Sequence, residues 1–333
     1  MKRVTLKDVA KRLGVAFSTV SMALSDDKEI SQVMKDKVNA AIKEMGYYPN
    51  RSARNLVKGS TNNLAVVTPG LFSLYEMFII RGMEEQMLES KYDLILYTAK
   101  YDWQEVHKEM RKILYEHTAD AVMVLGVMLT DEIIDEYQKV KMPLILIDGG
   151  VNSKALTLNI DNYECGKIAA EHFIKTGKKK PALMLGNTKF AFSQAERLKG
   201  FTETLIKNKM TISDDFIIER PEYFPDDLRK LGFKYGEELI KKGADAIYCG
   251  SGDYVAQGIY KYCVENSIKT PDTLSIIGTD NFDVAEALNL TTIQQPLMEM
   301  GKKSFEIAET ASGKGLSDMQ NLFFKPKLVI RNT

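Results

Sequence analysis

The sequence predicts a small all-α module followed by a larger α/β body of two lobes, each a parallel sheet flanked by helices. Three short amphipathic helical patterns occupy the first 48 residues. From Leu64 onward, short runs of Val, Ile and Leu alternate with amphipathic stretches, which is typical of parallel βαβ units. These units form two series, and a chain of 333 residues is long enough for such a head and body.

The three helices of the module have local start and stop signals. Thr5 can cap the first helix and Gly14 can end it, and Ser31 and Gly46 can do the same for the third helix. The second helix is expected at about 17–25. The interior positions predicted by helical spacing are Leu6, Val9, Ala10 and Leu13, then Val20, Ala23 and Leu24, then Val38, Ala41, Ile42 and Met45.

Two helices joined by a Gly-containing turn, with a third helix to complete the core, match the helix-turn-helix plan. In the second helix, Ser18, Met22 and Ser25 point away from the interior, and Phe17 lies at the exposed amino-terminal end. Residues 1–60 hold twelve Lys and Arg against six Asp and Glu, which leaves 33 basic and 39 acidic residues for the rest of the chain. A basic head on an acidic body fits binding to DNA phosphates, and a protein-docking bundle is the alternative.

The polar, basic stretch between Pro49 and Leu64 has the composition of a linker. Within it, Ala53, Arg54 and Leu56 fall within one helical turn. An exposed Leu between basic residues could act as an apolar wedge that unstacks a base step from the minor groove. A plain linker and a DNA-contacting hinge therefore both fit this stretch.

The first 60 residues resemble the headpiece and hinge of the lactose-repressor/galactose-repressor (LacI/GalR) family of bacterial transcription regulators, on the segments TLKDVAKRLGVAFSTVSMAL and VNAAIKEMGYYPNRSARNL. The resemblance implies that the second helix enters the major groove, that the hinge folds into a short helix on operator DNA, and that Leu56 intercalates. It assigns base reading to Phe17, Ser18 and Met22, contacts with phosphate, sugar or the minor groove to Thr19, Ser21, Asn50 and Arg54, and further DNA contacts to Thr5 and Ala53. Many members have a polar residue where this chain has Met22. The Met22 side chain is therefore expected either to touch a thymine methyl group or to take no part in base reading, and the operator sequence of other members does not carry over to this chain.

Strands and helices alternate along the body. The predicted strands lie at 64–67, 93–97, 121–125 and 144–147 in the first series, and at 182–185, 216–218, 246–249 and 274–278 in the second. The predicted helices lie near 76–89, 104–116 and 131–139, and near 163–176, 192–208, 226–242 and 253–266. The chain is thereby divided into a helix-turn-helix domain at 1–48, a hinge at 49–62 and a body at 63–333.

The body resembles the same family, which shares a two-lobed fold with periplasmic sugar-binding proteins. This resemblance implies three crossings between the lobes, near 160, 292 and 322. The first lobe would comprise about 63–160 with 293–321, and the second about 161–292 with 322–333, closed by a strand near 327–330. Ligands of parallel sheets bind at the carboxyl ends of the strands, so an effector is expected in the cleft between the lobes.

Four charged residues lie where a ligand of such a body would bind. Asp148, Asp253 and Asp280 each follow a predicted strand, and Arg197 lies on the helix after the strand at 182–185. A single Asp after a strand is equally well explained as a helix cap or a turn former. The prediction of a site therefore depends on the convergence of these residues.

The resemblance assigns effector-binding roles to these and neighbouring positions. Arg197 and Asp280 match positions that hold effector hydroxyls or purine edges, and Asp148 matches a further contact of some members. Tyr75 matches an aromatic of the pocket, which Phe72 could assist. Aromatic rings combined with Arg and carboxylates suit a sugar. The chain departs from the family pattern, and so leaves the effector open, at Glu76, Gly252, Thr279 and the long segment that contains Tyr223 and Phe224.

Several protein classes are excluded by what the sequence lacks. No apolar run approaches the roughly eighteen residues of a membrane span, and the basic start is not followed by a secretory apolar core. The three cysteines have no CxxC spacing, so neither a disulfide framework nor a zinc site is expected at Cys165, Cys249 and Cys263. Neither a GxxxxGK[ST] phosphate loop nor a paired-histidine motif occurs, so we expect no enzyme, no cofactor and no metal.

These observations predict a cytoplasmic transcriptional repressor of carbohydrate genes that binds double-stranded operator DNA and responds to a small molecule, with a sugar favoured. A regulator that responds to a purine or a nucleoside is the alternative, and a sugar receptor that does not bind DNA is a further one. The last residues, up to Thr333, form no heptad tail, so we expect a homodimer without a tetramerising extension.

Overall fold

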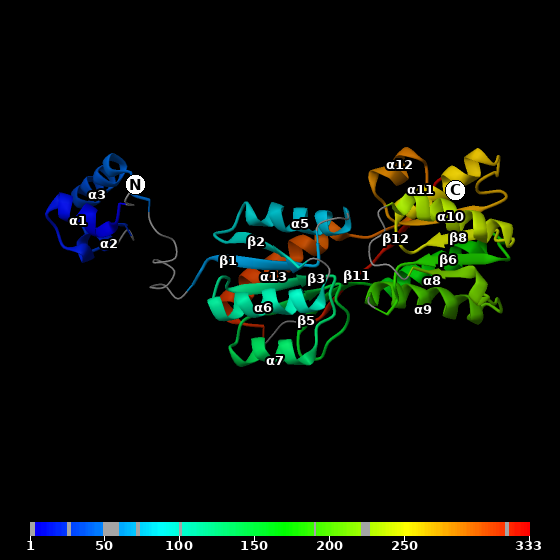
Figure 1. Cartoon of the computed structure of the whole chain (residues 1–333), viewed down its shortest axis with the longest axis horizontal. Helices are drawn as coiled ribbons and strands as arrows, with labels where there is room; N and C mark the ends of the chain where they lie inside the picture. Colours follow the sequence, from blue (N-terminus) through cyan, green and yellow to red (C-terminus); the bar gives the residue numbers. More distant parts are fainter. Residues whose placement is uncertain are drawn as a thin grey trace. The chain divides into compact units, whose positions relative to one another are not determined.

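The computed structural model (Figure 1) describes residues 4–24, 28–48, 60–70, 74–99, 102–189, 191–220, 227–316 and 320–333. The chain divides into two compact units, Met1–Thr61 and Asn62–Thr333. The first unit is helical, and the second contains two six-stranded sheets with helices on their faces. The predicted fold class, an all-α headpiece and an α/β body of two lobes, is confirmed. None of the described helices combines the length and the apolar character that crossing a bilayer requires.

The headpiece helices begin and end at the predicted signals. At the start of the first helix, the Thr5 hydroxyl accepts from the backbone N–H of Asp8, and the Asp8 carboxylate accepts from the backbone N–H of Thr5. Gly14 and Gly46 adopt the left-handed conformation that ends a helix. The three helices are α1 (Leu6–Leu13), α2 (Phe17–Leu24) and α3 (Gln32–Met45), and their buried core comprises Val9, Ala10, Val20, Ala23, Val38 and Ala41.

The sheet of the first lobe is parallel and is covered on both faces (Figure 1). Leu64 and Val66 of β1 pack with helices α5 and α13, whereas Ala65 and Val67 pack with helices α6 and α7 on the other face. Burial on both faces explains the continuous apolar runs of these strands. In sheet order the elements are β11 (Leu322–Phe324), β5 (Leu156–Ile160), β4 (Leu144–Ile147), β3 (Ala121–Leu125), β1 (Asn63–Thr68) and β2 (Asp93–Thr98), flanked by α5 (Leu74–Met87), α13 (Leu297–Lys314), α6 (Trp103–Glu116) and α7 (Asp131–Lys139).

The sheet of the second lobe repeats this plan, with one antiparallel strand at its edge. Ala246 and Tyr248 of β8 pack with α8 and α9, and Ile247 and Cys249 pack on the face of α10 and α11. In sheet order the strands are β12 (Lys327–Val329), β10 (Thr291–Gln294), β9 (Ser275–Asp280), β8 (Ala246–Cys249), β6 (Pro181–Leu185) and β7 (Ile217–Glu219). The helices are α8 (Asn162–Lys175), α9 (Phe192–Lys207), α10 (Leu228–Lys241), α11 (Asp253–Glu265) and α12 (Asp283–Ala287), and a short 3-10 turn η1 (Asp214–Phe216) precedes β7.

Two of the three crossings lie a few residues later than predicted. Strand β10 at Thr291–Gln294 still pairs in the second sheet, and β11 at Leu322–Phe324 pairs in the first sheet. The chain therefore crosses after Gln294 and again between β11 and β12. Strands β5, β10 and β11 and helices α12 and α13 were not predicted. Strands β5 and β10, with the segments LTLN and TTIQ, carry polar residues that are buried only through tertiary contacts.

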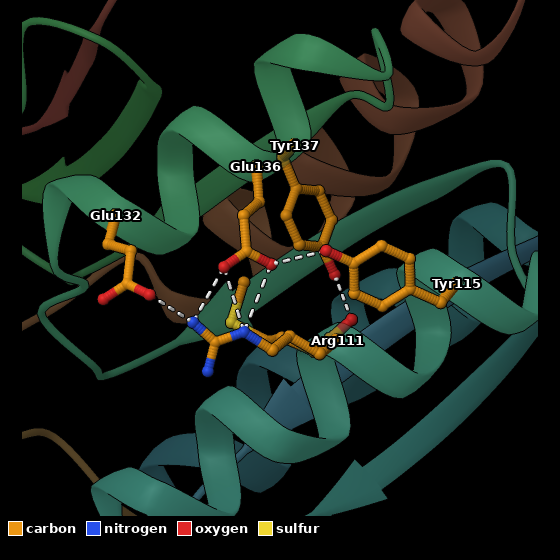
Figure 2. A network of polar contacts seen from close by, with 6 residues as sticks. Arg111, Tyr115, Glu132, Glu136 and Tyr137 are labelled. Carbon is orange, nitrogen blue, oxygen red and sulfur yellow. Dashed lines mark hydrogen bonds and ion pairs between the residues drawn. The ribbon is translucent and has the colours of Figure 1, made fainter.

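An exposed polar network joins α6 to α7 (Figure 2). Arg111 of α6 donates to Glu136 of α7 from Nε at 3.0 Å and from Nη2 at 2.7 Å, and it donates to Glu132 at 2.9 Å. The Tyr115 hydroxyl donates to Glu136 at 3.2 Å. We call Arg111, Tyr115, Glu132 and Glu136 the surface network.

Candidate functional site

Two acidic side chains lie at the carboxyl ends of parallel strands, one in each lobe. Asp148 directly follows β4, and Asp280 is the last residue of β9. Both have positive φ angles, 51° for Asp148 and 105° for Asp280. Non-glycine residues adopt this backbone region uncommonly, and Asp is among those that adopt it most readily.

The carboxylate of Asp148 is linked to a buried arginine through an amide. Arg197 of α9 donates from Nε to Asn162 Oδ1 at 2.9 Å, and Asn162 Nδ2 donates to Asp148 Oδ1 at 3.1 Å. The Tyr75 hydroxyl donates to the other oxygen of Asp148 at 2.8 Å. The amide of Asn162 thus accepts from the cation and donates to the anion.

A second amide links the same arginine to Asp280. Arg197 donates from Nη2 to Gln295 Oε1 at 3.0 Å, and Gln295 Nε2 donates to Asp280 Oδ1. The remaining terminal nitrogen, Nη1, donates to the backbone carbonyl of Gly250. We call Asp148, Asn162, Arg197, Asp280 and Gln295 the amide-linked cluster.

The amide-linked cluster joins the two lobes. Asn162 begins α8 just after the first crossing, and Gln295 lies between β10 and α13 at the second crossing. The bond from Asn162 to Asp148 therefore connects the second lobe to the first. Close to the same strand ends, the rings of Phe78 on α5 and Phe282 after β9 stack with centroids 5.3 Å apart.

Burial dominates the electrostatics of the cluster. Removal from water raises the pKa of Asp148, although the Arg197 charge and hydrogen bonds from Tyr75 and Asn162 oppose the rise. Burial likewise raises the pKa of Asp280 to about 6, against the attraction of Arg197. Burial next to Asp148 also raises the pKa of the Tyr75 hydroxyl, which stays a hydrogen-bond donor.

Asp253 occupies a different position from the other two acids. It begins α11, is fully buried, and accepts from the Thr292 hydroxyl at 2.6 Å and from the backbone N–H of Phe282 at 2.8 Å. Burial, together with repulsion from Asp280, raises its pKa to about 8. Both oxygens are thus engaged in holding β10 and the loop after β9, which supports a structural role, and the effector contact predicted for Asp253 stays a prediction.

The structure brings together Tyr75, Asp148 and Arg197, and it adds Asp280 through Gln295. Asn162 and Gln295 were missed by the sequence analysis, because they follow strands β5 and β10, which were not predicted. A polar residue at a chain crossing was the signal that could have identified them. Phe72, Tyr223 and Phe224 lie outside the described residues. Among the residues that are described, no group of three or more His, Cys, Asp or Glu is placed to hold a metal ion.

The second helix of the headpiece presents most of its predicted DNA contacts to solvent. Phe17 is 51% exposed, Ser18 and Ser21 are exposed, and Thr19 and Met22 are partly exposed. Thr5 caps α1, which leaves its predicted DNA contact untested. The predicted hinge contacts, Asn50, Ala53, Arg54 and Leu56, lie outside the described residues.

Comparisons of the sequence match both parts of the chain to known domains. Residues 5–50 match a family described as bacterial regulatory proteins, lacI family, and residues 170–333 match a periplasmic binding protein-like domain. The HTH-type transcriptional repressor PurR of Vibrio parahaemolyticus serotype O3:K6 is 30% identical over 99% of this chain and 98% of its own length.

Comparisons of the structure find the same overall fold in solved proteins. A lac repressor dimer bound to operator and the anti-inducer ONPF has a TM-score of 0.86, at 21% identity over 100% of this chain and 99% of that chain. A complex of the transcriptional regulator CelR with cellobiose has a TM-score of 0.71, at 22% identity over 99% of each chain.

Proposed function

The chain belongs to the LacI family of bacterial regulatory proteins and is a DNA-binding transcriptional repressor, and from this premise we propose that a small molecule bound between its two lobes controls its affinity for operator DNA. As a member of a family of repressors, the protein is not an enzyme. The proposal includes a cytoplasmic location and a homodimer that presents two headpieces to a pseudo-palindromic operator.

One observation carries the proposed effector site. The amide-linked cluster connects two carboxylates of different lobes to one buried guanidinium through two side-chain amides, at the carboxyl ends of parallel strands. A ligand that exchanged hydrogen bonds with Asp148 and Asp280 would change the link between the lobes. A coupling of about 1–3 kcal/mol would then change operator affinity by roughly 5- to 150-fold.

The effector that we favour is a sugar, and the regulated genes that we favour are carbohydrate genes. Hydroxyl groups suit the carboxylate acceptors, and the Tyr75 ring suits the apolar face of a sugar. A purine or nucleoside is the second candidate, and the 30% identity to a repressor named PurR along almost the whole chain favours testing it.

In the headpiece, we propose that α2 reads bases in the major groove through Phe17, Ser18 and Met22. Thr19 and Ser21, with Asn50 and Arg54 of the hinge, would contact phosphate, sugar or the minor groove. Thr5 and Ala53 would make further DNA contacts, and Leu56 would wedge into the minor groove. The exposure of Phe17 and Ser18 on a helix without acidic residues supports this assignment.

A gel-shift assay with genomic fragments tests the proposal directly. The full chain should retard a subset of fragments, and one class among sugars and nucleosides should change that retardation. Leu56→Ala should weaken specific binding far more than nonspecific binding, because a wedge acts only where a base step unstacks. Indifference to all fragments, with and without these compounds, would refute the proposed function.

A further inference from the structure

Two phenylalanine rings form an apolar contact between the lobes. Phe78 lies on α5 in the first lobe, and Phe282 directly precedes α12 in the second lobe (Figure 1). Their ring centroids are 5.3 Å apart and the ring planes differ by 16°, so the rings are stacked. Stacked aromatic rings contribute free energy beyond that of the area they bury. We call Phe78 and Phe282 the aromatic pair.

The aromatic pair belongs to an apolar region that continues from one lobe into the other. Phe282 is 6% exposed and is part of one buried cluster that includes Leu64 of the first lobe and Leu183 and Tyr248 of the second. The partly buried Phe78 packs against the same cluster. Rotation of one lobe against the other would separate the two rings and expose them to water, which the hydrophobic effect opposes.

The ring of Phe282 is fixed to the second lobe. The backbone N–H of Phe282 donates to Asp253 Oδ2 at 2.8 Å, and the backbone carbonyl of Phe282 accepts from the N–H of Ala285 at 2.8 Å. Next to it in the chain, the Oδ1 atom of Asn281 accepts from Arg331 Nη2 at 2.8 Å. These hydrogen bonds hold the backbone on both sides of the ring, so Phe282 moves with its own lobe.

The ring of Phe78 is fixed to the first lobe. Its helix, α5, packs against α13 so closely that a Cβ atom on Gly82 would overlap the backbone of Met298. A Cβ atom on Gly301 would likewise overlap the backbone of Ile79, the residue after Phe78. Such close packing leaves α5 little room to slide or rotate on α13. The position of the Phe78 ring is therefore set by the first lobe.

We propose that the aromatic pair is a latch that holds the two lobes at the angle of this structure, and that the strength of this latch sets the operator affinity of the chain before an effector binds. Because each ring is fixed to its own lobe, the rings stack only over a narrow range of interlobe angles. A ligand that moves the lobes beyond this range has to break the stack. The effect on operator affinity rests on the proposed function, in which the interlobe arrangement controls DNA binding.

Pulsed electron paramagnetic resonance on the full chain measures the distance between the lobes without DNA. Nitroxide labels are attached at Val140→Cys in the first lobe and at Ile206→Cys in the second, both exposed positions. The three native cysteines are buried, so the label reacts selectively with the introduced ones. Dilution with an excess of unlabelled chain restricts the measured distance to two lobes of the same chain.

The variants Phe78→Leu and Phe282→Leu each remove the stack but keep an apolar side chain. Either variant should raise the population of distances outside the wild-type distribution by at least about threefold. The double variant should change no more than the larger single variant, because both substitutions break the same contact. In a gel shift, both variants should change the operator affinity in the same direction, by at least about threefold.

A matched control breaks an aromatic contact inside one lobe. Phe233 on α10 and Tyr262 on α11, both in the second lobe, have ring centroids 5.2 Å apart. Phe233→Leu loses a contact of similar size, but this contact does not join the lobes. The distance distribution and the operator affinity of this control should therefore stay within about twofold of the wild type.

Unchanged distances in both variants of the aromatic pair, additive changes in the double variant, or an equal change in Phe233→Leu would overturn the inference. An unchanged operator affinity in a chain that binds specific fragments would overturn it as well. Absence of specific DNA binding by the wild-type chain would instead reject the proposed function, while the distance measurement would still decide whether the two rings hold the lobes together.

Discussion

The surface network and the amide-linked cluster each combine one arginine with two acidic residues, but they connect the charges differently. In the surface network, Arg111 touches the carboxylates of Glu132 and Glu136 directly (Figure 2). In the amide-linked cluster, the contacts of Arg197 with the two acids pass through the side-chain amides of Asn162 and Gln295.

The difference follows from solvent. Arg111 lies at the surface, where water screens a direct ion pair and leaves it little net free energy. Arg197 is buried, and each buried polar group there must be hydrogen-bonded. The neutral amides accept hydrogen bonds from the guanidinium and donate hydrogen bonds to the carboxylates, so the buried cluster links its charges indirectly, whereas the surface network pairs its charges directly and joins two helices.

The largest effect is expected from Arg197→Ala. This change leaves the acceptors of Asn162, Gly250 and Gln295 without their donor and removes the cation near the buried carboxylates. We expect the free energy of unfolding, measured by urea denaturation, to fall by about 3–5 kcal/mol. The effector response in a gel shift should also be lost, and an unchanged response would remove Arg197 from the site.

Next in size is the pH dependence that the buried acids impose. Asp253 and Asp280 have raised pKa values in the folded chain, so the folded state retains protons that the unfolded state has released. The free energy of unfolding should therefore fall as pH rises from about 4 toward 8, with a slope of up to about 1.4 kcal/mol per pH unit for each proton.

The variant Asp253→Asn tests the contribution of one of these titrating groups. Its amide is neutral at all these pH values, so the variant should show a shallower decline in urea denaturation between pH 6 and about 8. A decline identical to that of the wild type would show that Asp253 does not titrate there.

A smaller effect is expected when either amide link is removed. Asn162→Ala removes the acceptor of Arg197 Nε and the amide donor to Asp148, and Gln295→Ala removes the acceptor of Arg197 Nη2 and the amide donor to Asp280. Each substitution should lower the free energy of unfolding by about 1–3 kcal/mol, as an unsatisfied buried polar group does. Because both links meet at Arg197, the two losses should not add in the double variant, and strict additivity would show that the links are independent.

The smallest effect is expected from Arg111→Ala in the surface network. The pair with Glu136, which lies at the surface and is partly exposed, should contribute at most about 1 kcal/mol to the free energy of unfolding, and less at high salt. Urea denaturation at two salt concentrations measures this contribution. A loss as large as that for Arg197→Ala would contradict the contrast between the two regions.

Most of the fold could be predicted from local signals in the sequence. The Thr5 cap and the Gly14 stop define α1 as predicted, and the strands at 121–125, 144–147 and 246–249 match the sequence prediction residue for residue. Such signals depend on neighbours along the chain and on the period of apolar residues, both of which are written in the sequence.

The arrangement of the candidate effector site depends on tertiary contacts. Asp148, Asp253 and Asp280 look alike in the sequence, since each follows a strand, yet Asp253 is engaged by Thr292 and the backbone of Phe282. Asn162 and Gln295 gain their importance only because two separate crossings of the chain bring them to one guanidinium. Hydrogen bonds between residues 14 to 98 positions apart depend on how the lobes fold together, and no local pattern encodes that arrangement.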